Sequence, residues 1–146
     1  MEQKSLSQLA ERMRGIDIAM LSTKTAAGSI ASRPMSNNGD VDFDGDAYFF
    51  TRSTSRLVAE VTADNRVSVA YSVEPGLLSG GGLFVAVEAD AEIIRDKARF
   101  REHWVPDLEG WFEDGIDTPD LVLLKVHAVH IRYWDGNEQG ELHLPA

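Results

Sequence analysis

Residues 49–57 read Phe-Phe-Thr-Arg-Ser-Thr-Ser-Arg-Leu, an apolar strand end followed by hydroxyls, two arginines and the start of a helix. Hydroxyl side chains at a helix start accept hydrogen bonds from its unpaired backbone N–H groups. The same N–H groups, together with the positive end of the helix dipole, form a site for an anion. Arg52 and Arg56 add positive charge beside them. The stretch predicts a phosphate-type site; the simpler alternative is that Thr54 or Ser55 only caps the helix and the arginines are solvated.

Periodicity and capping signals divide the rest of the chain into strands and short helices. Alternating apolar residues predict half-buried strands, and apolar residues three or four apart predict amphipathic helices. Ser5 and Gln8 form a capping-box pattern at the first helix. Pro34 cannot donate to a ladder, so the second strand lies at a sheet edge or ends there. The predicted strands are residues 16–21, 30–35, 47–51, 67–72, 85–93 and 121–134, and the predicted helices begin at Ser5, Ser55 and Asp96.

Two features of this pattern make specific structural predictions. In the first strand, Ile16, Ile18 and Met20 share one face and alternate with residues of the other. Residues 136–140 are polar and are interpreted as a tail segment after the last strand. Six strands with three short helices predict a mainly β fold, most economically a small antiparallel barrel, and we expect residues 1–146 to form one domain.

The composition of the chain excludes several function classes. A formal net charge of −10 argues against nucleic acid and anionic membrane surfaces as partners, because both require a basic face. We find no apolar run long enough to span a bilayer and no signal-peptide pattern at the first residues. The absence of cysteine excludes disulfides, thiolate metal sites and a cysteine nucleophile. The simplest compartment is the cytoplasm.

Histidines and aspartates offer no evident catalytic or metal constellation. His127 and His130 lie three apart on a predicted strand and should point to opposite faces, so they should not share a metal. His103 and His143 have no evident partner. The aspartates of residues 40–46 lack the spacing and the closing glutamate of an EF-hand loop. We therefore expect no metal site and name no catalytic acid or base.

Several short motifs, in order along the chain, resemble the general-stress-protein branch of the pyridoxamine-phosphate-oxidase-like flavin-binding split barrels. The resemblance runs from about Leu6 to Trp134. No single motif decides it, but their order is specific. The motifs are Arg33-Pro34-Met35, Phe49-Phe50-Thr51, Ser55, Val58-Ala59-Glu60-Val61, Trp104-Val105-Pro106, Trp111-Phe112-Glu113-Asp114-Gly115, Pro119-Asp120-Leu121 and Tyr133-Trp134-Asp135.

The resemblance implies a six-stranded antiparallel split β-barrel that forms a homodimer and binds FMN in clefts at the subunit interface. Three of the implied residues line the flavin, two border the ribityl chain and phosphate, and two bind the phosphate at the helix start. In that order they are Arg33, Pro34, Met35, Phe50, Thr51, Ser55 and Arg56. One position departs from the family, since Leu57 stands where its members commonly place a lysine.

The first functional interpretation is an FMN-binding homodimer, either a flavin-dependent oxidoreductase or a general-stress-type flavin-binding protein. A second is a non-catalytic binding module for flavin or haem, where a haem would need His103, His127 or His130 as axial ligand. A third is a cofactor-free structural dimer, for which Leu57 is the relevant clue. Pyridoxamine-phosphate oxidation itself is not expected, because the chain is short and no substrate-phosphate cluster follows Leu121. The substrate and the electron donor stay open.

Overall fold

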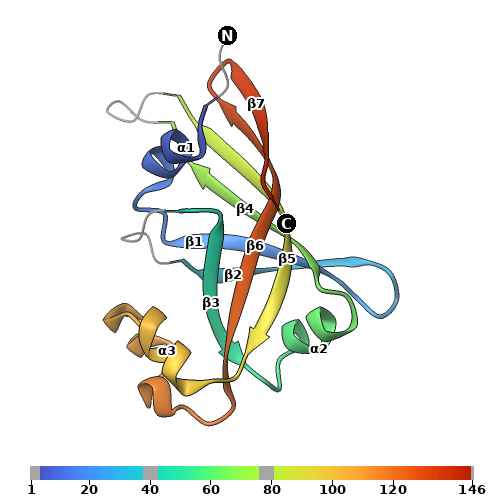
Figure 1. The fold of residues 1–146 in the computed structure, drawn as a ribbon, viewed down its shortest axis with the longest axis vertical. Helices are drawn as coiled ribbons and strands as arrows, with labels where there is room; N and C mark the ends of the chain where they lie inside the picture. Colours follow the sequence, from blue (N-terminus) through green and yellow to red (C-terminus); the bar gives the residue numbers. More distant parts are fainter. Residues whose placement is uncertain (1–3, 38–42, 76–80, 146) are drawn as a thin grey trace.

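The computed structural model describes residues 4–37, 43–75 and 81–145, which form one twisted antiparallel sheet with short helices around it (Figure 1). The aspartates at 40 and 42 and part of the predicted connection at 74–82 lie outside the described residues. The elements are α1 Leu6–Met13, β1 Ile18–Lys24, β2 Ile30–Ser36, β3 Asp46–Arg52, α2 Arg56–Ala63, β4 Arg66–Val73, β5 Leu83–Ile94, α3 Lys97–His103, η1 Pro106–Gly110, η2 Gly115–Asp117, β6 Leu121–Asp135 and β7 Glu138–His143.

The strands follow the order β2-β1-β4-β5-β6-β3, and every pairing is antiparallel. The 15-residue strand β6 organises this sheet, because it pairs with β5 along its length, with β3 through its first half and with β7 through its second. No described pairing joins β2 to β3, so the sheet curls without closing. The predicted mainly β, split-barrel architecture is confirmed, and Pro34 lies on an edge strand as expected.

The predicted number of six strands is wrong, because the segment after Gly136 folds as a seventh strand. Gly136 adopts a left-handed φ of 62° at the turn, and β7 then pairs with the end of β6. Its residues alternate only between exposed and half-buried positions. A strand that buries little apolar surface has no hydrophobic period, which is why the segment resembled a polar tail.

The first strand is present, and the structure selects which of its two apolar faces lies inward. Ala19, Leu21 and Thr23 are buried, whereas Ile18 and Met20 keep 46% and 42% of their surface exposed. Both faces of this strand carry apolar residues, so alternation cannot select the inward face. The outward face of β1 is therefore an apolar surface.

A β-bulge in β6 corrects the predicted orientation of its two histidines. Glu88 of β5 pairs with His130 while Ala89 pairs with Ala128, which leaves Val129 as an extra residue. An extra residue shifts the alternation by one position. Buried residues accordingly fall at 126 and 128 before the bulge and at 131 and 133 after it. His127 and His130 thus lie on the same outer face and not on opposite faces.

Two apolar clusters pack against the sheet. The larger fills the concave side and includes Phe49 and Leu57. The smaller lies between β3, β6 and the segment 100–116, where Phe50 and Phe100 pack edge to face. In Figure 1, α2 and α3 lie on opposite sides of β3, in keeping with these two clusters. Within the described residues, none of the helices has the length and apolar character needed to cross a membrane.

Candidate functional site

The start of α2 forms as the sequence predicts. Ser55 is its N-cap, and the Ser55 hydroxyl accepts a hydrogen bond of 3.3 Å from the Val58 N–H. The Thr51 hydroxyl donates to the same Ser55 oxygen over 3.4 Å, which joins the end of β3 to the helix start. Arg56 is the first helical residue and is exposed. The predicted hydroxyls and one predicted arginine are therefore together at a helix N-terminus.

Arg56 also borders a groove of about 730 Å³ between α2 and the β1–β2 turn. The turn contributes Lys24 through Gly28, and the helix contributes Ala59 and Glu60 along with Arg56. Lys24 and Arg56 give this groove two cations, and Glu60 and Asp64 give it two carboxylates. A groove with cations beside a helix N-terminus suits an elongated molecule that ends in an anion.

Arg33 points to the same flank of α2 and is bonded within the protein. Its guanidinium donates to Glu60 over 2.8 Å and to the Thr23 hydroxyl over 2.8 Å, and Thr23 donates to the same Glu60 oxygen over 2.7 Å. The Thr23 hydrogen bond and the Arg33 ion pair lower the pKa of Glu60. This network connects β1 and β2 to α2, so the Arg33 side chain is a structural link between β2 and the helix.

Leu57 is buried beneath α2, with 4% of its surface exposed, and belongs to the larger apolar cluster. The neighbouring Arg56 is exposed, because consecutive helical residues point about 100° apart. A lysine at position 57 would therefore point into the core of this chain and not at an anion. Packing in the larger apolar cluster therefore explains why leucine stands at position 57, where the family resemblance implies a lysine.

The other three predicted residues do not gather with the start of α2. Pro34 is exposed on the edge strand β2, while the Met35 side chain is buried in the larger cluster. Phe50 belongs to the smaller cluster and lies edge-on to Trp104, with 5.0 Å between ring centroids. A contact of these residues with one ligand would have to use backbone atoms of β2 and the outer side of β3.

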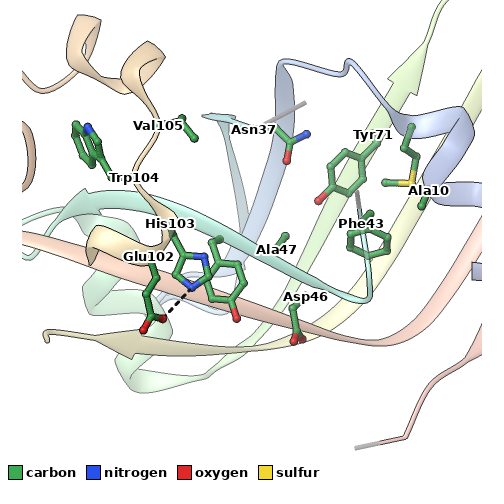
Figure 2. A pocket seen from close by; sticks show the side chains of 12 residues that line it. Ala10, Asn37, Phe43, Asp46, Ala47, Tyr71, Glu102, His103, Trp104 and Val105 are labelled. Carbon is green, nitrogen blue, oxygen red and sulfur yellow. Dashed lines mark ion pairs between the residues drawn. The ribbon is translucent and has the colours of Figure 1, made fainter. Parts of the chain in front are cut away.

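A cavity of about 230 Å³ lies where β3 faces α1 and the end of α3 (Figure 2). Figure 2 shows Asn37, Phe43 and Tyr71 at one end of it and Glu102 and His103 at the other. A second cavity of about 400 Å³ shares some of its lining, namely Asn37, Tyr48, His103 and Val105. Because Asn37 follows β2, both cavities lie at the opening between the two terminal strands of the sheet path.

His103, one of the three histidines that the sequence offered as haem ligands, lines both cavities through a contact that the sequence did not reveal. Its imidazole stacks on the Tyr48 ring, with centroids 3.6 Å apart and an interplanar angle of 16°. Burial lowers the pKa of His103, which favours the neutral imidazole in the cavity. Tyr48 and His103 are 55 positions apart in the sequence, so only the docking of α3 against β3 brings them together. No local motif signals that contact.

The other two histidines considered as haem ligands are held by protein groups. His127 contacts an Asp46 carboxylate oxygen over 2.6 Å through Nδ1 and the Pro145 carbonyl over 2.9 Å through Nε2. His130 contacts Glu88 through Nδ1 and Glu141 over 3.2 Å through Nε2. Of the three, His103 is the one that lines the cavity in Figure 2.

A family model described as pyridoxamine 5'-phosphate oxidase like matches residues 4–144, which is nearly the whole chain. The chain belongs to this family. The suspected membership of the pyridoxamine-phosphate-oxidase-like split barrels is thereby confirmed, and the general-stress branch is supported by the structural neighbours. A search of curated protein sequences finds no significant match.

Among solved structures, the family member is similar to a protein from Clostridium acetobutylicum related to general stress protein 26 of Bacillus subtilis. The TM-score is 0.80 at 20% identity, over 99% of this chain and 97% of the other. General stress protein 26 from Bacillus anthracis gives a TM-score of 0.71 at 23% identity, over 93% and 98%. A heme binding protein from Mycobacterium smegmatis gives 0.74 at 16% identity, over 98% of this chain and 60% of the other. At these identities the likeness concerns the fold.

Proposed function

We propose that this family member binds FMN, with the phosphate at the start of α2 and the flavin ring at the free edge of β2. The observation that carries the proposal is the junction of β3 and α2, where two hydroxyls and Arg56 meet at a helix N-terminus. Hydroxyls, a guanidinium and free N–H groups are the donors that a phosphate requires. The residues present therefore fit the phosphate end of the cofactor.

The edge strand β2 supports a place for the flavin ring. In the described sheet β2 pairs only with β1, so its other edge presents backbone N–H and C=O groups that no strand uses. The rim of a flavin ring carries both donors and acceptors, and an unpaired strand edge offers the complementary groups. Arg33, Pro34 and Met35 lie on this strand, so their proposed role is to line the ring.

We propose that the protein is a homodimer whose interface includes the outer face of β1 and β2. Ile18, Met20 and Ile30 are exposed there, the last at 77% of its surface. Exposed apolar patches on monomers mark interaction sites. A partner chain on this face would complete the cleft for a ligand held at the β2 edge. Sedimentation that gives a stable monomer of 16.1 kDa at micromolar concentration would contradict this part of the proposal.

Bound FMN supplies the redox chemistry of a flavin-dependent oxidoreductase, and the chain supplies binding and orientation. Similarity to general stress proteins supports a flavin-binding stress role as the physiological setting. Cytoplasmic location stays a prediction from the sequence.

Titration of the purified protein with FMN and with riboflavin tests the proposal. Hydrogen bonds to charged groups contribute roughly 1.5–3 kcal/mol each. Arg56→Ala should therefore weaken FMN binding by about one to two decades, at about 1.4 kcal/mol per decade. Riboflavin lacks the phosphate, so its affinity should not change. Arg101→Ala, which removes an exposed arginine of α3, is the matched control and should leave both affinities unchanged.

Equal losses for FMN and riboflavin in Arg56→Ala would show that the effect is structural and would remove the phosphate assignment. Unchanged FMN affinity would remove it as well. The visible spectrum of the purified protein gives an independent readout, because flavin, haem and a chromophore-free protein differ in absorption.

Haem binding is the second candidate, favoured by one observation. His103 lines the cavity beside β3, and the similar fold from Mycobacterium smegmatis bears the name heme binding protein. An axial imidazole is a common haem ligand. In this alternative, a Soret band appears on haem addition and is lost in His103→Ala, whereas Arg56→Ala leaves it unchanged.

A further inference from the structure

Strands β5, β6 and β7 carry a row of imidazoles and carboxylates on their outer face. His130 lies directly opposite Glu88 on one side and directly opposite His143 on the other. Glu141 precedes His143 by two residues and so shares its face. The row depends on the bulge at Val129 and on β7, which are the two features that the sequence did not predict.

Three of these side chains bring donor atoms to one point. Glu141 places one carboxylate oxygen 3.2 Å from His130 Nε2 and the other 3.8 Å from His143 Nε2. One donor atom from each of the three residues lies within 4.8 Å of the others. Donors at bond lengths near 2.0 Å around a tetrahedral ion are about 3.3 Å apart, so the three side chains must turn toward one another to share one ion.

Glu88 orients His130 for metal binding. The Nδ1 atom of His130 contacts the Glu88 carboxylate, and Arg132 approaches that same carboxylate at 3.8 Å. A neutral imidazole has one ring proton, and donation of it to Glu88 leaves Nε2 with its lone pair toward the other ligands. Histidine ligands of metals commonly donate their other ring N–H to a carboxylate in this way, which fixes the orientation of the ring.

His130 contacts a charged or aromatic neighbour at each side of its ring. His130 has a carboxylate at each ring nitrogen, and a neutral ring can donate to only one of them. His143 stacks on the same ring with centroids 4.3 Å apart and an interplanar angle of 6°. Rotation of one of the two stacked rings would point the Nε2 atoms of both histidines at a single divalent cation, with a Glu141 carboxylate oxygen as the third donor.

We propose that His130, Glu141 and His143 form a binding site for a late transition-metal ion of the Zn²⁺ class. Two imidazoles and one carboxylate suit Zn²⁺, Cu²⁺ and Ni²⁺, whereas Mg²⁺ and Ca²⁺ require oxygen ligands. Three protein ligands leave one position of a tetrahedral ion to water. The site is on the outer face of β6 and β7 and does not depend on the proposed FMN site.

Calorimetric titration of the full-length, chelator-treated protein with Zn²⁺ tests the site. We expect one saturable Zn²⁺ per chain. His143→Ala, which replaces an exposed side chain, should weaken Zn²⁺ binding by at least tenfold. Glu88→Ala should weaken it by about 10–100-fold, because the carboxylate that orients His130 is lost. The matched control is His127→Ala, since His127 lies on the same face but is bonded to Asp46 and Pro145. That variant should bind as tightly as the wild type.

Cu²⁺ provides a second readout, because electron paramagnetic resonance detects hyperfine coupling to nitrogen ligands. Coupling to two imidazoles is expected in the wild type and to one in His143→Ala. Absence of saturable Zn²⁺ binding would overturn the proposal and leave His130 as a hydrogen-bonding partner of Glu88 and Glu141. Equal Zn²⁺ affinities for His143→Ala and the wild type, or a comparable loss in His127→Ala, would overturn it too.

Discussion

Replacement of Leu57 by lysine distinguishes a core position from a ligand-facing one. The leucine is 4% exposed within the larger apolar cluster, one residue after the exposed Arg56. Family resemblance alone suggests that lysine here would add a cation for phosphate. The structure leads to the opposite expectation, namely loss of stability without gain of FMN affinity.

The magnitude follows from the burial of the side chain. Truncation of a buried leucine to alanine costs about 2–5 kcal/mol. Lysine retains part of the apolar stem but must either desolvate its ammonium group or withdraw from the core, so Leu57→Lys should cost at least a similar amount. Domains are stable by only about 5–15 kcal/mol. At roughly 2–4 °C per kcal/mol for a chain near this length, the melting temperature should fall by about 4–20 °C.

Urea unfolding at fixed protein concentration, without cofactor, measures this loss. A fixed concentration is necessary because association would shift the apparent stability. Arg56→Lys is the matched control, since it places lysine one position earlier at an exposed site and should change stability by no more than about 0.5 kcal/mol. FMN titration of both variants completes the comparison.

Unfolding of Leu57→Lys at the same urea concentration as the wild type, together with tighter FMN binding, would contradict burial of this side chain. That pair of results would mean that position 57 faces the ligand. Destabilisation together with unchanged FMN affinity, measured well below the transition, is the outcome that burial requires.

Two further predictions concern strands β6 and β7. Hydrogen bonds to Pro145 and Asp46 raise the pKa of His127, so its contribution to stability is present below about pH 6.5 and is lost as the pH rises through the raised folded-state value. His127→Asn should therefore flatten the fall in unfolding free energy between pH 6 and 9, and identical slopes would contradict the assignment. Gly140→Ala would push a Cβ into the buried Tyr133 ring and should cost about 1–3 kcal/mol by thermal denaturation, whereas Gly110→Ala, with open space around it, should be neutral.

Local signals decided the parts of this chain in which side chains act on their own backbone. The capping box at Ser5 and the N-cap at Ser55 formed as predicted, because a hydroxyl can satisfy a nearby N–H wherever the helix packs. Val67, Val69 and Tyr71 are buried as their alternation predicted, since only one face of β4 is apolar. The start of α2, and with it the phosphate part of the candidate site, could be predicted for the same reason.

Features that depend on a distant partner could not be predicted. The inward face of β1 was undetermined because both of its faces are apolar, and pairing with β4 selects Leu21. The strand β7 has no hydrophobic period, and β6 alone gives it a partner. The contact between Tyr48 and His103 depends on how α3 docks against β3.

The sequence by itself therefore determined the family, the three α-helices and six of the seven described strands. Tertiary structure decided which faces those elements present. A single extra residue at Val129 turns His130 to the face of His127 and opposite His143, and no local pattern encodes that shift, because a bulge is defined by the register of two strands. Likewise, Leu57 of α2 is buried in the apolar core, at a position where the family resemblance alone suggests a cation for phosphate. Both outcomes depend on contacts between segments far apart in the chain, and the local pattern of apolar and polar residues does not predict those contacts.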